Sequence, residues 1–171
     1  GDAIRDYFLN YEIRNSDVTV TLGSRELEIH NGHPETGWRV TMAETGEKTM
    51  TGGRLKRVAP YLTGERFLMT YGDAVASVNI KSVIAFHEQH GKLGTVTAVH
   101  PSSRFGELSI EKNMVEVFQE KPQVHSGWIN GGFFVFQREV LDLIKGDEES
   151  LEHGLLVKLA TMKQLAVYQH D

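Results

Sequence analysis

The run Phe67-Leu68-Met69-Thr70-Tyr71-Gly72-Asp73 constrains the fold more than any other stretch of this chain. Its apolar half predicts a buried strand that ends at Tyr71-Gly72. Asp73 then presents a carboxylate just past that strand. In an open α/β sheet, ligands bind beyond the carboxyl ends of the strands, and an aspartate there suits a hard cation that holds phosphate oxygens. The alternative, in which Asp73 only caps the next turn, is equally open.

Composition and charge narrow the class of protein. The chain has 171 residues, of which 40% are hydrophobic, enough for one globular domain. Its net charge of −5 argues against a nucleic-acid polymer as partner. No apolar run approaches the roughly 20 residues needed to span a membrane, and no signal peptide is recognisable. The absence of cysteine excludes disulfides and thiolate chemistry, and agrees with a cytoplasmic location.

Hydrophobic periodicity predicts alternating helices and strands. Helical spacing appears in residues 2–11, 54–62, 80–90, 140–145 and 151–162. Strand patterns appear in residues 18–22, 26–30, 38–42, 67–71, 95–99, 132–136 and 165–168, and a hairpin in residues 105–119. Such alternation is typical of an α/β sheet flanked by helices. Because no repeat or linker divides the chain, we expect a single domain over residues 1–171.

The tetrapeptide Thr51-Gly52-Gly53-Arg54 stands at the entrance of a predicted helix. Backbone amides at such a place attract anions, and glycine lets the backbone approach a ligand closely. These four residues are therefore candidates for binding a nucleotide. The alternative is a plain loop-to-helix transition with two convenient glycines.

Two further motifs are candidates for binding a sugar phosphate. Glu120 can accept hydrogen bonds from vicinal hydroxyls, and Lys121 offers a positive charge to a phosphate. Asn130-Gly131-Gly132 can bring a sugar ring close to the backbone while Asn130 bonds its hydroxyls. The alternatives are an exposed strand end terminated by proline and a turn before a core strand.

The order of these motifs resembles that of the sugar-1-phosphate nucleotidyltransferases, and most of all the members that join CTP to glucose 1-phosphate. The matching segments, in order, are Thr49-Met50-Thr51-Gly52-Gly53-Arg54-Leu55-Lys56-Arg57, Thr70-Tyr71-Gly72-Asp73, Arg104-Phe105-Gly106, Phe118-Gln119-Glu120-Lys121-Pro122 and Ile129-Asn130-Gly131-Gly132-Phe133-Phe134-Val135. Five ordered motifs make this resemblance specific, and it extends over essentially the whole chain.

The resemblance implies a mixed, mostly parallel Rossmann-like sheet and Mg²⁺-dependent synthesis of CDP-glucose and pyrophosphate. It implies a homo-oligomeric parent whose product feeds polysaccharide biosynthesis. Asp73 is then the metal ligand and, with Lys121, a catalytic residue. The implied nucleotide-binding residues are Thr51, Gly52, Gly53 and Arg54. The implied sugar-phosphate residues are Gly106, Glu120, Lys121, Asn130 and Gly131.

The chain departs from the family at both ends. The family's Gly-x-Gly-Thr-Arg-Leu loop, which holds the triphosphate, has no counterpart here, and neither does the segment leading to a second metal-binding aspartate. Ala74 and Ser77 also replace a glycine and an aspartate that family members tend to have. We therefore expect a fragment, incomplete at the N-terminus and nearly inactive alone. Loss of a central strand would expose an apolar sheet edge, which predicts marginal stability, rearrangement or pairing with another copy.

Two alternatives to the CTP-dependent activity follow. One is a nucleotidyltransferase that uses UTP or dTTP, since the residues around Thr51 do not settle the choice of base. The other is a non-catalytic module that binds a sugar phosphate or a nucleotide without turnover.

Overall fold

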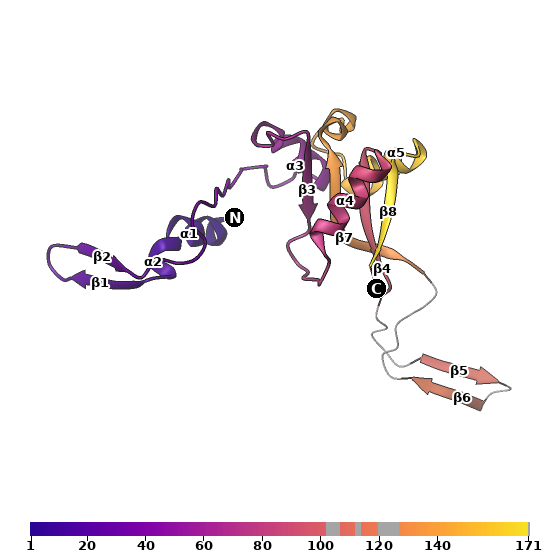
Figure 1. Ribbon diagram of the computed structural model, residues 1–171, viewed down its shortest axis with the longest axis horizontal. Helices are drawn as coiled ribbons and strands as arrows, with labels where there is room; N and C mark the ends of the chain where they lie inside the picture. The colour runs from indigo at the N-terminus through magenta and orange to yellow at the C-terminus, as the bar shows by residue number, and fades with distance from the viewer. Residues whose placement is uncertain (102–106, 112–113, 120–126, 171) are drawn as a thin grey trace. The chain divides into compact units, whose positions relative to one another are not determined.

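A computed structural model of the chain describes residues 1–101, 107–111, 114–119 and 127–170 (Figure 1). The chain divides into two compact units, Gly1–Glu44 and Thr45–Asp171. The single domain expected over residues 1–171 stays a prediction. Among the described residues, no helix is both long and apolar enough to cross a membrane.

The first unit consists of two short helices and a hairpin. These elements are α1 (Asp2–Leu9), α2 (Tyr11–Arg14), β1 (Asp17–Thr21) and β2 (Glu26–His30). The two strands pair in antiparallel register, with Val18 opposite Ile29. The strand predicted over residues 38–42 is wrong, because no strand is assigned to this segment and it joins no sheet.

The second unit contains a mixed four-stranded sheet in the order β3-β7-β4-β8 (Figure 1). Its strands are β3 (Arg66–Thr70), β4 (Gly94–Val99), β7 (Ile129–Gln137) and β8 (Leu165–His170). β7 runs antiparallel to both β3 and β4, whereas β4 and β8 are parallel. Three of the four strands thus share one direction, and the predicted mixed α/β sheet is confirmed.

The helices of the second unit bury the sheet's apolar side chains. These elements are α3 (Thr51–Arg57), the 3₁₀ turns η1 (Ala59–Tyr61) and η2 (Arg138–Leu143), α4 (Ile80–His90), the π-helical turn η3 (Leu151–Leu156) and α5 (Val157–Thr161). The core joins Phe134 and Phe136 of β7 to Leu151, Leu155 and Leu159, all at most 1% exposed. The predicted helix over residues 151–162 is therefore present, but its first half is wound as a π-helix.

The predicted hairpin in residues 105–119 is confirmed. It is formed by β5 (Glu107–Glu111) and β6 (Met114–Gln119), which pair antiparallel with Leu108 opposite Phe118. The expected stop of α4 is also present, because Gly91 adopts a left-handed conformation with φ of 60°.

Two histidines of α4, His87 buried and His90 half-buried, link this helix to β4. His87 Nδ1 lies 2.8 Å and His90 Nε2 lies 2.7 Å from the Thr95 hydroxyl oxygen. The His87 side chain is fully buried, and its Nε2 has no hydrogen-bond partner among the described residues. Burial is the main cause that lowers the pKa of both histidines. The next cause is the neighbouring His90 for the pKa of His87, and Lys92 for the pKa of His90.

This pair predicts loss of stability in mild acid. The unfolded chain, whose histidines titrate near pH ~6.5, takes up protons before the folded chain does. The stabilising contribution is therefore complete above about pH 6.5 and declines as the pH falls below it. Denaturant unfolding at pH 7.5, 6.5 and 5.5 should give a shallower pH slope for His87→Gln than for the wild type. Exposed His153 supplies the control, and an equal slope for His87→Gln and His153→Gln would contradict the prediction.

Candidate active site

The carboxylate of Glu152 joins three of the predicted motifs. Glu152 lies in the first turn of η3 and accepts hydrogen bonds from Thr51 and Tyr71. Tyr71 follows β3, and its hydroxyl is also 3.5 Å from the Asn130 side-chain nitrogen at the start of β7. The nucleotide motif, the strand-end motif and the Asn130 motif therefore meet at one end of the sheet, although they are widely separated in the sequence.

The two glycines of the nucleotide motif let α3 pack directly on the loop of residues 144–150. A Cβ on Gly52 would lie 2.6 Å from the Glu149 carbonyl oxygen, and one on Gly53 would lie 2.6 Å from the Asp147 Cα. The Gly53 amide donates to the Glu149 carbonyl at 3.1 Å. Both glycines are buried, so the structure gives them a packing role at the predicted site.

Ionic and polar contacts also hold α3 against the loop of residues 144–150. Arg57 Nε donates to the Asp147 carboxylate at 2.8 Å, and Lys56 donates to the Ile144 carbonyl. Arg54 instead reaches backwards, donating to the Thr45 hydroxyl at 2.7 Å and the Glu47 carbonyl at 3.0 Å. Arg54 thereby holds the segment that precedes α3.

Asn130, Gly131 and Gly132 lie inside β7, so the turn considered as one alternative is wrong. Val96 of β4 pairs with Phe134, but Ala98 pairs with Asn130, which leaves a bulge in β7 between these two pairs. Gly132 has φ of 79°, and a Cβ there would lie 2.9 Å from the Tyr71 ring. Its amide donates to the Asn130 side-chain oxygen at 2.9 Å, which orients that amide group. The bulge therefore fixes the orientation of the Asn130 amide group and gives the Tyr71 ring room to pack on Gly132.

Asp73 is exposed in the loop that follows β3, as the sequence predicted. No hydrogen bond or ion pair engages its carboxylate within the part of the chain that the structure describes. It lies close enough to Tyr71 to contribute to the pKa of that hydroxyl. Asp73 is therefore open to an external ligand and is next to the Glu152 network.

Charge and burial oppose each other in this network. Burial, followed by the hydrogen bond to Glu152, raises the pKa of Tyr71 to about 12, so the hydroxyl stays protonated and donates. Burial resists ionisation of Glu152, but hydrogen bonds from Tyr71, the backbone, Ser150 and Thr51 hold its pKa below the ordinary value. The carboxylate is consequently ionised at neutral pH, and each of its two oxygens accepts at least one hydrogen bond.

The donor set suits one metal ion held jointly by protein and substrate. Across residues 1–101, 107–111, 114–119 and 127–170, no group of three or more histidines or carboxylates converges to form a complete metal cage. Mg²⁺ is commonly bound through one or two carboxylates together with substrate phosphates. The exposed Asp73 carboxylate at the strand end fits that arrangement.

Three predicted site residues, Gly106, Glu120 and Lys121, lie outside the described residues. Their roles stay predictions. Glu152 was missed by the sequence interpretation, because an acidic residue in the first turn of a helix is ordinarily explained by the helix dipole. Its partners Tyr71 and Thr51 are 81 and 101 residues away, so no local pattern identifies it.

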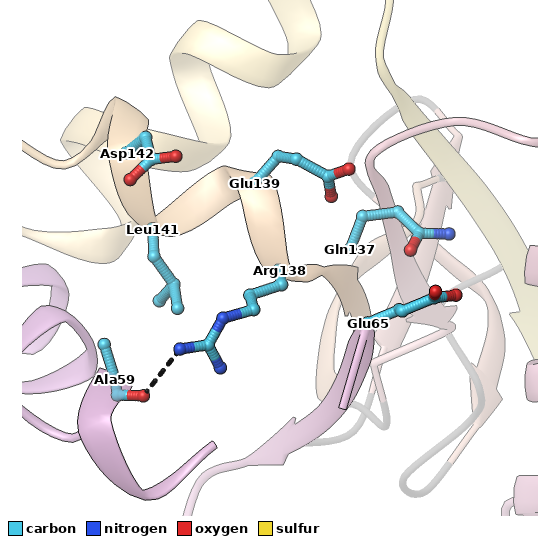
Figure 2. A pocket seen from close by; sticks show the side chains of 7 residues that line it. All are labelled: Ala59, Glu65, Gln137, Arg138, Glu139, Leu141 and Asp142. Carbon is cyan, nitrogen blue, oxygen red and sulfur yellow. Dashed lines mark hydrogen bonds between the residues drawn. The ribbon is translucent and has the colours of Figure 1, made fainter. Parts of the chain in front are cut away.

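A cavity of about 550 Å³ lies at the other end of the same strands (Figure 2). Glu65 precedes β3 and Gln137 ends β7, whereas the Glu152 network adjoins the end of β3 and the beginning of β7. Arg138 points into this cavity and donates to the Ala59 carbonyl at 3.1 Å (Figure 2). None of the predicted site residues lines it.

Comparison with known proteins identifies the family. Residues 15–170 match the model of the nucleotidyl transferase family. A glucose-1-phosphate cytidylyltransferase of Salmonella typhi is 46% identical over 171 residues, covering 99% of this chain and 66% of the relative. A probable glucose-1-phosphate cytidylyltransferase of Bacillus subtilis is 39% identical over the same shares of the two chains. The chain thus spans just under two thirds of the length of these relatives.

Comparison with solved structures supports the α/β fold described above. The crystal structure of HddC from Yersinia pseudotuberculosis superimposes with a TM-score of 0.51. The match covers 72% of this chain and 54% of that one, at 22% identity, and therefore supports the fold alone.

The contact of α3 with residues 147–149 predicts a selective effect of adding one methyl group. Gly53→Ala should lower the free energy of unfolding by at least about 1 kcal/mol, since overpacking against backbone outweighs the roughly 1 kcal/mol gain in helix propensity. Gly146→Ala is the control, because no atom lies within 4 Å of a Cβ at that position. Denaturant unfolding would contradict the prediction if Gly53→Ala were as stable as Gly146→Ala.

Proposed function

Because this chain belongs to the nucleotidyl transferase family, we propose that the protein transfers a cytidylyl group from CTP to α-D-glucose 1-phosphate. The products are CDP-glucose and pyrophosphate. The identity of 46% with the Salmonella typhi enzyme, over 99% of the chain, is the observation that carries the choice of CTP and glucose 1-phosphate. The convergence of three motifs on Glu152 supports the position of the site.

In the proposed reaction, a phosphate oxygen of glucose 1-phosphate attacks the α-phosphorus of CTP. A new phosphorus–oxygen bond forms as the bond from the α-phosphorus to the bridging oxygen breaks, and pyrophosphate leaves with that electron pair. No covalent enzyme intermediate is needed, so the protein contributes positioning and charge stabilisation. Mg²⁺ would be held by Asp73 and would supply positive charge that offsets the negative charge developing on the phosphates.

The described residues suit the nucleotide side of this reaction. Asp73, exposed and unengaged among the described residues, is the proposed metal ligand. The tight packing of Gly52 and Gly53 fixes the beginning of α3, where Thr51 faces Glu152. We assign the nucleotide to the helix entrance formed by Thr51, Gly52, Gly53 and Arg54, where the two buried glycines contribute through packing.

The sugar phosphate is assigned to the residues around the β7 bulge and to segments outside the described residues. Asn130 and Gly131 adjoin Tyr71 and β4, so a sugar placed there would lie within reach of the same network. Gly106, Glu120 and Lys121 complete the proposed pocket. Lys121 is assigned to the sugar phosphate and is the second proposed catalytic residue.

The wider setting follows from the proposed reaction. Its ligands are CTP and glucose 1-phosphate, with no nucleic-acid polymer or membrane as partner. We propose a homo-oligomer in the cytoplasm whose CDP-glucose serves polysaccharide biosynthesis. A nucleotidyltransferase that uses UTP or dTTP, and a binding module without turnover, are the competing functions that the first experiment separates.

The proposal is tested by pyrophosphate release from glucose 1-phosphate and Mg²⁺. CTP, UTP, dTTP, ATP and GTP are supplied separately. We expect turnover with CTP and little or none with the other four nucleotides. Turnover with another nucleotide alone would reassign the base. Binding of glucose 1-phosphate without any turnover would favour the non-catalytic module.

Asp73→Asn should abolish most of the Mg²⁺-dependent activity, because the amide keeps the shape but removes the charge that a hard cation requires. We expect kcat to fall roughly 100-fold or more, the order of loss typical of electrostatic contacts to transition-state charge. Asp142→Asn, a change at another exposed aspartate, which lines the cavity of Figure 2, is the control. Equal activity of the two variants across a Mg²⁺ titration would remove Asp73 from the site.

A further inference from the structure

We propose that Glu152 is a positioning residue that ties the nucleotide side of the site to its sugar side. This inference rests on the proposed function, because it assigns Thr51 to the nucleotide and Asn130 to the sugar. It adds a residue that neither the sequence motifs nor the relatives' names assign. Glu152 is not a catalytic residue in this account, because it acts through the residues that it holds.

The two oxygens of the Glu152 carboxylate face different segments. Oε2 accepts from the Thr51 hydroxyl at 3.0 Å and from the Ser150 hydroxyl at 2.9 Å. Oε1 accepts from the Tyr71 hydroxyl at 2.5 Å. One side chain therefore bonds α3 through one oxygen and the segment after β3 through the other.

The hydrogen bonds beyond the carboxylate have a defined direction. Thr51 Oγ1 accepts from the Leu151 amide at 2.8 Å, so its own proton is free to point at Glu152. Asn130 offers its side-chain nitrogen to the Tyr71 hydroxyl oxygen at 3.5 Å, and the Tyr71 proton then points at Glu152. Donors from both sides thus end on the one carboxylate, and either side loses its acceptor if the carboxylate turns away.

The local backbone holds Glu152 in place. Ser150 caps η3, since its side chain accepts from the His153 amide at 3.1 Å. Leu151 and Leu155 on the same turn are fully buried. The π-helical winding of η3 is itself a feature that recurs at functional sites. Because the turn is anchored in the core, Glu152 can restrain Thr51 and Tyr71 rather than follow them.

A mutant cycle tests the link without altering Glu152 first. Thr51→Val removes the donor to Oε2 together with the acceptor of the Leu151 amide, and Tyr71→Phe removes the donor to Oε1 together with the acceptor of the Asn130 side chain. Within the described part of the chain, Glu152 is the group that links the two hydroxyls. In the intact protein, kcat/KM for the nucleotide and for the sugar phosphate is measured in the single variants and the double variant. Independent sites add, whereas sites joined by one network do not. We expect the double variant to deviate at least about threefold from the product of the single effects.

The same cycle in a Glu152→Gln background identifies the residue that carries the coupling. Glutamine keeps the size of the side chain but replaces one acceptor by a donor, so one of the two hydroxyls loses its partner. We expect Glu152→Gln to lower kcat/KM roughly 10- to 100-fold, the scale of loss for small displacements of reacting groups, and to abolish the deviation. Glu148→Gln is the control, because Glu148 is exposed four residues earlier in the same segment.

The outcomes separate this inference from the proposed function. Additive effects of Thr51→Val and Tyr71→Phe in an active wild type overturn the role of Glu152 and leave the cytidylyl transfer intact. If Glu152→Gln fails to fold, as judged by thermal unfolding, the first cycle still decides. If the wild type turns over no nucleotide, the proposed function fails. The same mutant cycle is then measured with the dissociation constants of CTP and glucose 1-phosphate in place of kcat/KM. Additive effects on both constants would then overturn the inference.

Discussion

The packing of α3 against the loop of residues 144–150 is the contact on which the rest of the site depends. Two missing side chains, at Gly52 and Gly53, let two backbones approach to a distance that any Cβ would prevent. The ion pair of Arg57 with Asp147 and the contact of Lys56 with Ile144 then keep α3 and this loop in their relative positions. The same loop leads directly into Ser150 and Glu152. An interaction that looks like simple helix packing therefore fixes the distance between Thr51 and its acceptor.

Part of this arrangement could be predicted from the sequence. The apolar run before Tyr71 and the β-branched run of β4 predict strands because a buried strand needs apolar side chains on both faces. Asp73 at a strand end was predicted from general α/β geometry. The segment of residues 38–42 has the same kind of pattern but no neighbouring strand to pair with, and pairing depends on contacts that a local pattern does not contain.

The rest could not be predicted because it depends on long-range contacts. The glycines of α3 suggested a ligand at close range, but the nearest atoms are the backbone of Asp147 and Glu149. The glycines after Asn130 suggested a turn, whereas the pairing of β7 with β4 makes them a bulge. Glu152 carries no local signal, since its importance comes from partners on two other segments. In each case the contact that decides the role of the residue is with a segment far along the chain.

The balance of burial and hydrogen bonding at Glu152 explains why its loss should affect both sides of the proposed site. A partly buried carboxylate stays ionised only while enough donors face it, and here those donors come from α3, from Ser150 and from the end of β3. The stabilisation is shared, so weakening any one donor makes the charge less favourable for the others. A network of this kind resists small independent movements of its members. Thr51 and Tyr71 are consequently held as a pair, which is what the proposed reaction between two bound phosphates requires of the surfaces that align them.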